Sequence, residues 1–526
     1  MHERNKKKIF ILLVVTLFFI AAIEILVLIF FRESWLDEEI YLFKSFSIMN
    51  GVFTPFKDII VEYPPLFIPV YGIVQVLFGP SFYVGRAVSS VLFIALLLVT
   101  FKLLRRKTNS WWALAGIALI LSDVFLVGNY VSATLYSLTA LLLMLCLIYV
   151  ERAAISLRVA SLLGFLMGLL MLARINMLPA VILIFLFLFF MRAHGRNIAA
   201  VFAFFAITIV VGYAPIVIPN PSLALSYIVY PIRPVGLLNG LTTRVAGRVP
   251  IIEFASVLVS FLHEYYAYIF LFFTTLLFLS TVYGKSLYAF AKKEKWFSFM
   301  VVLDFAFLLT HYFNPHLIGS VYYANYFIPV IVVTFIYAFH RFIPHKRFSA
   351  SLVISIIVLN GCISAFRTDV ISDPRSESDL KRVSRGAELI KKYTTRGDTV
   401  LTFDNSVYHV FVADRKVLPF SINRDFHYIN IEDKPKAERL LLYNFSILSE
   451  KIRSAKFVAL NLESWKDLFI RANFYTGHDS QGEAKAAEIE NILAKDFVLM
   501  GSAHNVYPRK YTDGNDGGTL LLYKHR

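Results

Sequence analysis

Long apolar runs dominate the first two thirds of this chain of 526 residues. About eleven of these runs are long enough, some of them marginally, to cross roughly 30 Å of hydrocarbon. In a bilayer the backbone must satisfy its polar groups within each segment, so such runs form helices. We therefore expect a mainly α, polytopic membrane bundle with spans at 9–31, 83–101, 111–128, 137–150, 159–173, 176–191, 198–217, 264–284, 296–313, 324–340 and 349–366.

One further apolar run is too short to be a span. Leu66 to Gly79 covers about fourteen residues, follows Pro64-Pro65, and suits a helix lying on the membrane surface better than a crossing. The first external loop is then long, about 32–82, and carries this helix. A second external loop is expected at about 218–263, and a shorter one within HYFNPHLIGSVYYANYF, residues 311–327.

The charge distribution supports this topology. With the N-terminus inside, the expected cytoplasmic segments hold nineteen Lys and Arg and three acids, an excess equal to the whole net charge of +16. The positive-inside rule thus explains the basicity, and no nucleic-acid partner is predicted. An odd number of spans places the C-terminus outside. We expect a multi-pass protein of the plasma (inner) membrane, with a cytoplasmic N-terminus and an uncleaved first helix.

The chain changes character after residue 366. Residues 367–526 alternate expected helices (378–393, 435–453 and 484–495) with expected strands (397–403, 455–462, 496–501 and 518–526). This alternation predicts a small extracytoplasmic α/β domain. The two cysteines, Cys146 and Cys362, both fall in expected spans, so neither a disulfide framework nor a cysteine metal site is available to it. The domain shows no catalytic motif, and we expect it to be structural or to recognise an acceptor.

Acids cluster in the first external loop. WLDEEIY, residues 35–41, brings Asp37 and Glu38 to the end of the first span, and EYPPLF brings Glu62 and Tyr63 onto a backbone stiffened by two prolines. A general base must be held within hydrogen-bond reach of the proton that it removes. A solvated acidic loop is the alternative interpretation of the same residues.

Arginines on the expected outer side weaken that alternative. Arg174, in MLARINMLPA, closes the fifth span, where a cation must be paired, snorkelling or ligand-binding. Guanidinium groups fit phosphate oxygens in bidentate fashion. Acids beside arginines at the membrane plane therefore favour group transfer from a lipid phosphate. The other outward arginines are Arg86, Arg233, Arg244 and Arg248.

These residues resemble the GT-C superfamily of glycosyltransferases. The similarity rests on W-x-D-E-x-x-Y after the first span, on E-x-P-P-L, on F-G-x-x-F-x-x-x-R-x-x-S from Phe78 to Ser89, and on Arg174. The branch most similar contains the protein O-mannosyltransferases and the lipid A aminoarabinose transferases, which are glycosyltransferase family 39-like. The motifs cover about residues 1–190, and the remainder is similar in layout only. Residues 1–366 would then form a transmembrane glycosyltransferase domain.

The resemblance implies roles for individual residues. Asp37 would be the base with Glu38 beside it, Glu62 would lie near the sugar or acceptor, and Arg174 would hold the donor phosphate. Such enzymes use polyprenyl-phosphate sugars and invert the anomeric centre. GNYVSATLYS, residues 128–137, departs from the family by lacking an acid, for which Asp123 would have to substitute. No cofactor is certain. Carboxylate oxygens would suit Mg²⁺ or Mn²⁺, which leaves metal dependence open.

Two further residues are candidates for donor or acceptor binding. His316 follows Asn314-Pro315, and Tyr323 lies in a tyrosine-rich stretch. The histidine suits a solvated or capping residue as well as a ligand, and the tyrosine suits an interfacial aromatic belt as well as a sugar-stacking wall.

The expected function is transfer of a sugar from a polyprenyl-phosphate donor to an extracytoplasmic lipid-linked glycan, envelope polymer or protein. Besides donor and acceptor, the expected partners are membrane lipids. This account requires Asp37 and Arg174 to face a common cavity. Two alternatives remain: a transporter or flippase with Glu24, Asp123 and Asp304 as coupling acids, and a polysaccharide ligase or polymerase that uses a lipid-diphosphate donor.

Overall fold

The chain forms two compact units, and each is described by itself. The first unit comprises Met1–Ile29, Arg86–Gly212 and Val245–Val370, and the second comprises Phe30–Gly85, Tyr213–Arg244 and Ile371–Arg526. The structure is a computed structural model. It describes residues 2–32, 36–61, 63–154, 156–229, 268, 293–313, 325–342, 346–365, 379–402, 406–418, 428, 432–470, 481–507 and 518–526.

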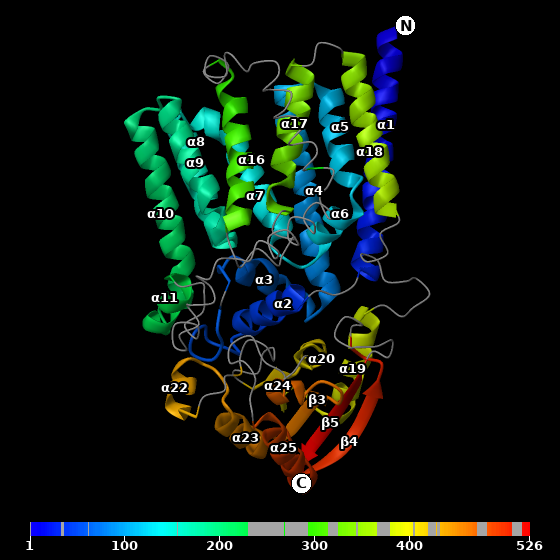
Figure 1. Cartoon of the computed structure of the whole chain (residues 1–526), viewed down its shortest axis with the longest axis vertical. Helices are drawn as coiled ribbons and strands as arrows, with labels where there is room; N and C mark the ends of the chain where they lie inside the picture. The colour runs from blue at the N-terminus through cyan, green and yellow to red at the C-terminus, as the bar shows by residue number, and fades with distance from the viewer. Residues whose placement is uncertain are drawn as a thin grey trace. The chain divides into compact units, whose positions relative to one another are not determined.

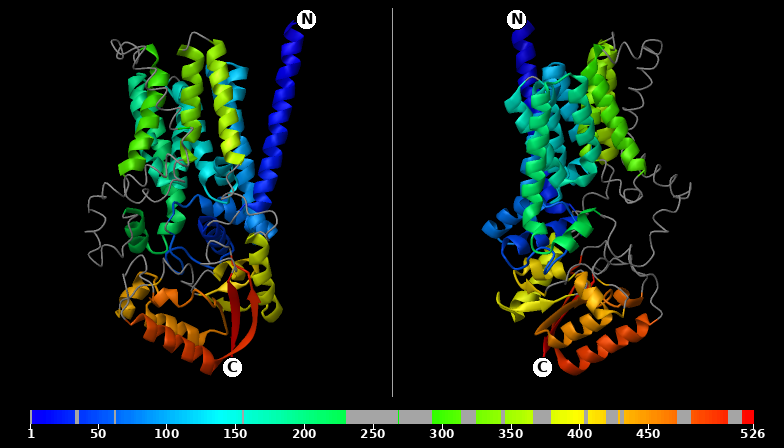
Figure 2. Two further views of the ribbon diagram at one scale, coloured as in Figure 1. Left: turned by 45° about the vertical axis from the view of Figure 1, so that its right-hand side comes forward. Right: turned by 90° about the vertical axis from the view of Figure 1, so that its left-hand side faces the viewer.

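The first unit is a bundle of apolar helices that run roughly alongside one another (Figures 1 and 2). Its helices confirm the predicted bundle: each expected span except 264–284 corresponds to a helix or to a broken pair, and 264–284 lies outside the described residues apart from Tyr268. The helices of this unit, some of which extend a few residues into the second, are α1 (His2–Phe31), α4 (Phe82–Lys107), α5 (Ser110–Leu121), α6 (Val124–Val131), α7 (Tyr136–Ala153), α8 (Leu157–Ala173), α9 (Leu178–Phe190), α10 (Gly195–Val217), α16 (Lys295–Phe313), α17 (Ile328–Phe342) and α18 (Lys346–Ala365).

Span lengths vary among these helices. Among the described residues, α1, α4 and α10 are long and apolar enough to cross a membrane alone. The run expected at 111–128 is not one straight helix, because α5 and α6 meet at an angle of 81°. The break falls at Ser122-Asp123, where Asp123 leaves the helical conformation and its carboxylate accepts the amide N–H of Leu126 at 3.0 Å. An acid that caps a new helix therefore ends the old one.

Two glycines allow α8 and α10 to approach closely. A Cβ atom built on Gly164 would lie 2.2 Å from the carbonyl oxygen of Val201, and one on Gly168 would lie 2.5 Å from Cβ of Thr208. Glycines four residues apart share one helix face, and such small-residue pairs let backbones meet in membrane bundles. Any side chain at Gly164 would therefore push α8 away from α10.

In the second unit, two short helices pack against each other. They are α2 (Leu36–Met49) and α3 (Phe67–Phe78). Gly72 lies so near α2 that a Cβ there would be 2.6 Å from the carbonyl oxygen of Ser45. The expected short helix after Pro64-Pro65 is thus present. It buries Phe67 and Tyr71 and exposes Leu77 and Phe78, and its placement on the membrane surface stays a prediction.

The C-terminal part of the second unit is the predicted α/β domain. Its five-stranded sheet has the order β2-β1-β3-β5-β4, parallel from β2 to β3 and antiparallel across β5 and β4. The expected strands and helices are present, except that the helix expected at 435–453 is divided into α22 and α23, while β2, α20 and α24 were not predicted. The elements are α19 (Asp379–Tyr393), β1 (Thr399–Leu401), α20 (Val407–Val412), β2 (Lys416–Val417), α22 (Lys434–Arg439), α23 (Phe445–Ser454), β3 (Phe457–Asn461), α24 (Asp467–Ile470), α25 (Gly482–Asp496), β4 (Phe497–His504) and β5 (Thr519–His525).

Aromatic contacts join this domain to the loop that precedes Arg86. The ring of Phe411 on α20 lies 5.8 Å from that of Phe46 and 6.2 Å from those of Phe43 and Phe82, in edge-on geometry. Helix α11 (Pro221–Val229) also belongs to the second unit, where the Asn220 amide donates to the carbonyl of Phe56 at 3.1 Å. Residues 30–85 thus form one compact body with the C-terminal domain.

Candidate functional site

Arg174 lies at the break between two helices of the first unit. Helix α8 ends at Ala173, and Arg174 is extended with φ −153° and ψ 123°, while its amide still donates to Leu170 at 3.0 Å. A short turn, η1 (Ile175–Met177), then leads into α9, which has Pro179 in its first turn. Proline is pre-organised for a helix start and needs no N–H partner there. Arg174 therefore extends from the end of α8, and the residue is 4% exposed.

Two tyrosine rings surround the Arg174 guanidinium. Its Cζ atom lies 5.8 Å from the ring centroid of Tyr136, at the start of α7, and 5.6 Å from that of Tyr326, just before α17. The two rings are 5.2 Å apart. Ring faces stabilise a desolvated cation electrostatically. We call these three residues the Arg174 clamp. The guanidinium of this clamp is a buried planar cation, and the geometry of such a group matches phosphate oxygens.

The clamp is supported by neighbouring aromatic contacts. Tyr130 on α6 donates its hydroxyl to the carbonyl of Asn325 at 2.5 Å, and its ring stacks on Phe93 of α4 at 5.1 Å. Phe327 stacks on Phe307 of α16 at 5.2 Å. These contacts fix the chain on both sides of Tyr326. The roles of Tyr130 and Tyr136 could not be predicted from the sequence. Nothing in their spacing links them to Asn325 and Tyr326, which lie nearly two hundred positions away.

Arg86 contacts the end of the first helix. Its side chain is fully buried, and Nη1 donates to the carbonyls of Ile29 at 3.0 Å and Leu28 at 3.4 Å. The last carbonyls of a helix lack intrahelical partners and carry partial negative charge. The guanidinium therefore stabilises the end of α1, a structural contact that the sequence did not indicate.

Acidic residues also lie within the helix bundle of the first unit. Asp123 is buried as the cap of α6, and Glu24 of α1 lies near enough for the two charges to interact. Asp304 is fully buried on α16 beside Thr334, whose hydroxyl donates to Val330 at 2.9 Å.

The second unit contains the acidic motif. Asp37, Glu38 and Glu39 occupy the first turn of α2, where the helix dipole favours negative charge. Glu38 and Glu39 are fully buried, and the side chain of Asp37 lies outside the described residues. Lys44, one and a half turns later, is also fully buried and donates to the carbonyl of Ile60 at 3.0 Å.

Tyr63 belongs to an aromatic group at the junction of α2 and α3. Its ring centroid lies 4.8 Å from that of Tyr41 and 6.5 Å from that of Phe67, and Tyr41 and Phe67 are 5.0 Å apart. Pro64-Pro65 therefore leads directly into a packed helix start. The remaining predicted site residues lie outside the described residues: Glu62, Arg233, Arg244, Arg248, His316 and Tyr323.

The described residues do not provide a metal site. Within them, no three His, Cys, Asp or Glu side chains are close enough to hold a metal ion. The side chain of Asp37 and all of Glu62 lie outside that search.

Known proteins match this chain in structure, and no match is found by family model or among curated proteins. The crystal structure of the Archaeoglobus fulgidus oligosaccharyltransferase in complex with zinc and sulfate is similar with a TM-score of 0.56 and 11% identity, over 96% of this chain and 88% of that one. ArnT from Cupriavidus metallidurans bound to undecaprenyl phosphate is similar with a TM-score of 0.55 and 10% identity, over 98% and 97%.

Both of these proteins are GT-C glycosyltransferases. The chain has the GT-C fold. The expected resemblance is thus confirmed for the architecture of a multi-pass membrane protein with a C-terminal domain. At such low identity the similarity shows the fold alone, and it does not show the chemistry.

Proposed function

We propose that this protein is a membrane glycosyltransferase that moves a sugar from a polyprenyl-phosphate donor to an acceptor outside the cytoplasm. The acceptor is a lipid-linked glycan, a cell-envelope polymer or a protein. The support from comparison is a shared fold with two GT-C glycosyltransferases over nearly the whole chain, one of them bound to undecaprenyl phosphate.

The observation that carries the proposal is the Arg174 clamp. An arginine buried among membrane helices is costly, and such residues usually serve a function. Here the cation sits at a helix end with aromatic faces about it. A phosphate bound there would be held by charge and by the planar fork of N–H donors.

Each group has one role in the proposed reaction. Asp37 accepts the proton of the acceptor hydroxyl as its oxygen attacks the anomeric carbon. The bond from that carbon to the phosphate oxygen breaks, and the lipid phosphate leaves with the electron pair. Arg174 stabilises the charge that grows on this phosphate. Attack opposite to the leaving group inverts the anomeric centre.

Glu38, beside the base in sequence, is assigned to catalysis with Asp37. The other residues are assigned to binding, and Glu62 and Tyr63 would contact the sugar or acceptor. Arg233, Arg244, Arg248, His316 and Tyr323 are proposed as further donor or acceptor contacts. Arg86 is proposed as a donor or acceptor contact as well, although its Nη1 also donates to the end of α1.

The proposed orientation follows from charge. The N-terminus would be cytoplasmic and the C-terminal domain extracytoplasmic, in a plasma (inner) membrane. A divalent cation such as Mg²⁺ or Mn²⁺ is compatible with the carboxylates of the first loop, but no role is assigned to it.

One observation favours a second candidate, a transporter. Glu24 and Asp123 interact within the bundle, and Asp304 is fully buried in the first unit. Intramembrane acids often couple ion movement to transport. In that case Asp304→Asn would abolish transport, whereas Asp37→Asn would be harmless.

The test is a donor panel. Purified protein in liposomes receives labelled polyprenyl-phosphate sugars, polyprenyl-diphosphate sugars or no donor, together with extracts of envelope lipid, glycan and protein. The proposal expects label transfer from at least one monophosphate donor. Transfer from diphosphate donors alone would favour a ligase or polymerase, and solute flux without transfer would favour the transporter.

A further inference from the structure

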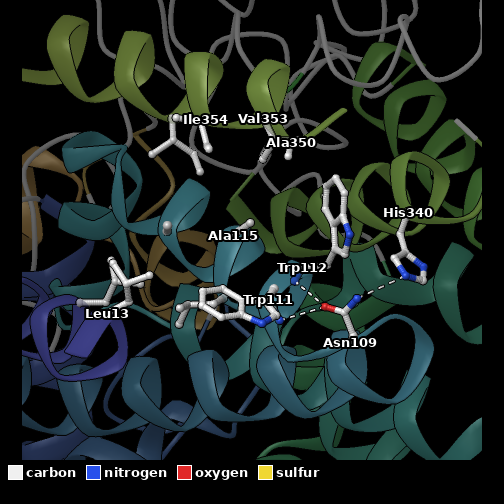
Figure 3. A pocket seen from close by; sticks show the side chains of 13 residues that line it. Leu13, Asn109, Trp111, Trp112, Ala115, His340, Ala350, Val353 and Ile354 are labelled. Atoms are coloured by element: carbon white, nitrogen blue, oxygen red, sulfur yellow. Dashed lines mark hydrogen bonds between the residues drawn. The ribbon is translucent and has the colours of Figure 1, made fainter. Parts of the chain in front are cut away.

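A groove in the first unit is lined mainly by aliphatic side chains. It has a volume of about 750 Å³ and lies among α1, α5 and α18, with His340 of α17 at one end (Figure 3). That volume falls within the roughly 300–1,000 Å³ of ligand sites. Side chains from three helices face one another across it, among them Leu13, Leu17, Ala115, Ala118, Val353 and Ile354.

One end of the groove is polar. The Asn109 side chain accepts the amide N–H groups of Trp111 at 2.9 Å and Trp112 at 3.1 Å, and its amide nitrogen lies 3.5 Å from Nε2 of His340 (Figure 3). Tryptophans concentrate where a bilayer meets water. From Asn109 to Ala118, α5 extends about 13 Å into the membrane at 1.5 Å per residue. The groove therefore runs from the interface toward the hydrocarbon.

The polar end carries positive charge. The ring of Phe10 on α1 lies 5.2 Å from that of Trp111, which places the start of α1 beside the start of α5. Lys6, Lys7 and Lys8 are exposed and precede Phe10 by about one turn or less. None of the described residues that line the groove is acidic. An apolar slot with a cationic rim complements an anionic amphiphile.

We propose that this groove binds one acyl chain of an anionic membrane phospholipid, whose head group lies against the lysines of α1. Basic residues at the ends of membrane helices attract anionic lipids in this way. The apolar contact holds the chain, and the lysines select the head group. The site is independent of the proposed reaction and would stabilise the bundle at its α1–α5–α18 seam.

The position of the groove argues against the polyprenyl-phosphate donor as its occupant. Lys107, two residues before Asn109, pairs with Glu151 at 2.8 Å, and Glu151 lies just before α8 in sequence. Arg174 is at the other end of α8, about 25 Å along the axis. The polar end of the groove and the Arg174 clamp thus lie at opposite ends of the bundle.

Native mass spectrometry of the full chain in detergent tests this proposal. The lipids are phosphatidylglycerol, phosphatidylcholine with the same acyl chains, and undecaprenyl phosphate, each added alone and in competition. The wild type should retain one phosphatidylglycerol about tenfold more tightly than phosphatidylcholine, a difference of about 1.4 kcal/mol. Ala115→Phe with Ala118→Phe should fill the groove and abolish this retention. Ala203→Phe, an exposed position on α10, is the matched control and should retain the lipid.

A second pair of variants tests the charged rim without altering the groove. Lys6→Gln with Lys7→Gln should reduce the preference for phosphatidylglycerol to about twofold, while Lys102→Gln, exposed on α4, should preserve it. Equal retention of the two phospholipids by the wild type would overturn the proposal. So would full retention by the groove-filling variant, or displacement of phosphatidylglycerol by equimolar undecaprenyl phosphate.

Discussion

The guanidinium carbon of Arg174 lies 5.6 Å from the ring centroid of Tyr326, although the two residues are separated by more than one hundred and fifty positions in the chain. This contact joins the end of α8 to the start of α17. It also brings an aromatic face against a cation that is 4% exposed. The account of function depends on what this cation binds.

Removing the cation should weaken donor binding. Hydrogen bonds to charged groups contribute about 1.5–3 kcal/mol, so Arg174→Ala should raise the donor KM by roughly 10- to 150-fold. Arg174→Lys should restore little of the donor binding, since an ammonium lacks the bidentate fork of a guanidinium. Arg158→Ala, an exposed arginine near the other end of α8, should leave donor saturation unchanged. An unchanged donor KM in Arg174→Ala would remove the donor-phosphate assignment.

The Tyr326 ring should matter more than its hydroxyl. A cation–π contact contributes about 0.5–2 kcal/mol, so Tyr326→Leu should raise the donor KM by roughly 2- to 30-fold. Tyr326→Phe preserves the ring and should stay within about twofold of the wild type. Saturation curves with a single labelled donor measure both variants. Equal effects of the two substitutions would show that the ring face is not what supports Arg174.

The packing of α8 on α10 should not tolerate a methyl group at Gly164. A Cβ there would meet the backbone of Val201 at 2.2 Å, so one helix must shift. Overpacking of this kind costs about 1–3 kcal/mol, and Gly164→Ala should lower the thermal unfolding temperature in detergent. The control is Gly361→Ala on α18, where the nearest atom is 4.0 Å away and alanine favours the helix. Equal unfolding temperatures for the two variants would contradict this packing.

The C-terminal domain should lose stability in acid through His409. The ring is buried against Tyr507, and its Nδ1–H donates to the carbonyl oxygen of Val383 at 3.0 Å. Burial lowers the pKa of His409 from 6.5 to about 4. Between these values the unfolded chain binds a proton that the folded chain does not. Stability is therefore full above pH 6.5 and falls by about 3 kcal/mol as the pH approaches 4.

Hydrogen exchange of amides in α19, corrected for intrinsic rates at pH 7.5 and 5, measures this loss in the full chain. His409→Gln should flatten the dependence on pH, because its side chain does not titrate. His525→Gln, at an exposed position, should leave the dependence intact. A wild-type protection factor that is constant between these two pH values would contradict the assignment.

Much of the fold could be predicted because the bilayer restricts the choices. Apolar runs of about twenty residues become helices whatever their neighbours, and helices separate most of the C-terminal strands along the chain. The break at Asp123 was harder, since a capping acid inside an apolar run resembles a functional acid. The role of Gly164 was also hidden, because its partner Val201 is set by tertiary packing.

The site was only partly predictable for a similar reason. Arg174 could be found because a cation at a helix end inside a membrane needs an explanation. Tyr136 and Tyr326 could not be linked to it, since aromatic residues are frequent in this chain and contact between distant segments is decided by the fold. Arg86 was expected to bind donor, which stays a prediction, and the hydrogen bonds from its Nη1 to the carbonyls of Leu28 and Ile29 could not be read from its position in the sequence.

The most direct measurement of the central claim is sugar transfer by Asp37→Asn. Wild type, Asp37→Asn and Glu438→Gln, an exposed acid of the same unit, are reconstituted in liposomes and given the polyprenyl-phosphate sugar that the wild type uses. Removal of a general base typically costs about 10²- to 10⁴-fold in rate. We predict a loss of that size for Asp37→Asn with normal membrane insertion, and an unchanged rate for Glu438→Gln. Transfer by Asp37→Asn within a few-fold of wild type would contradict the account.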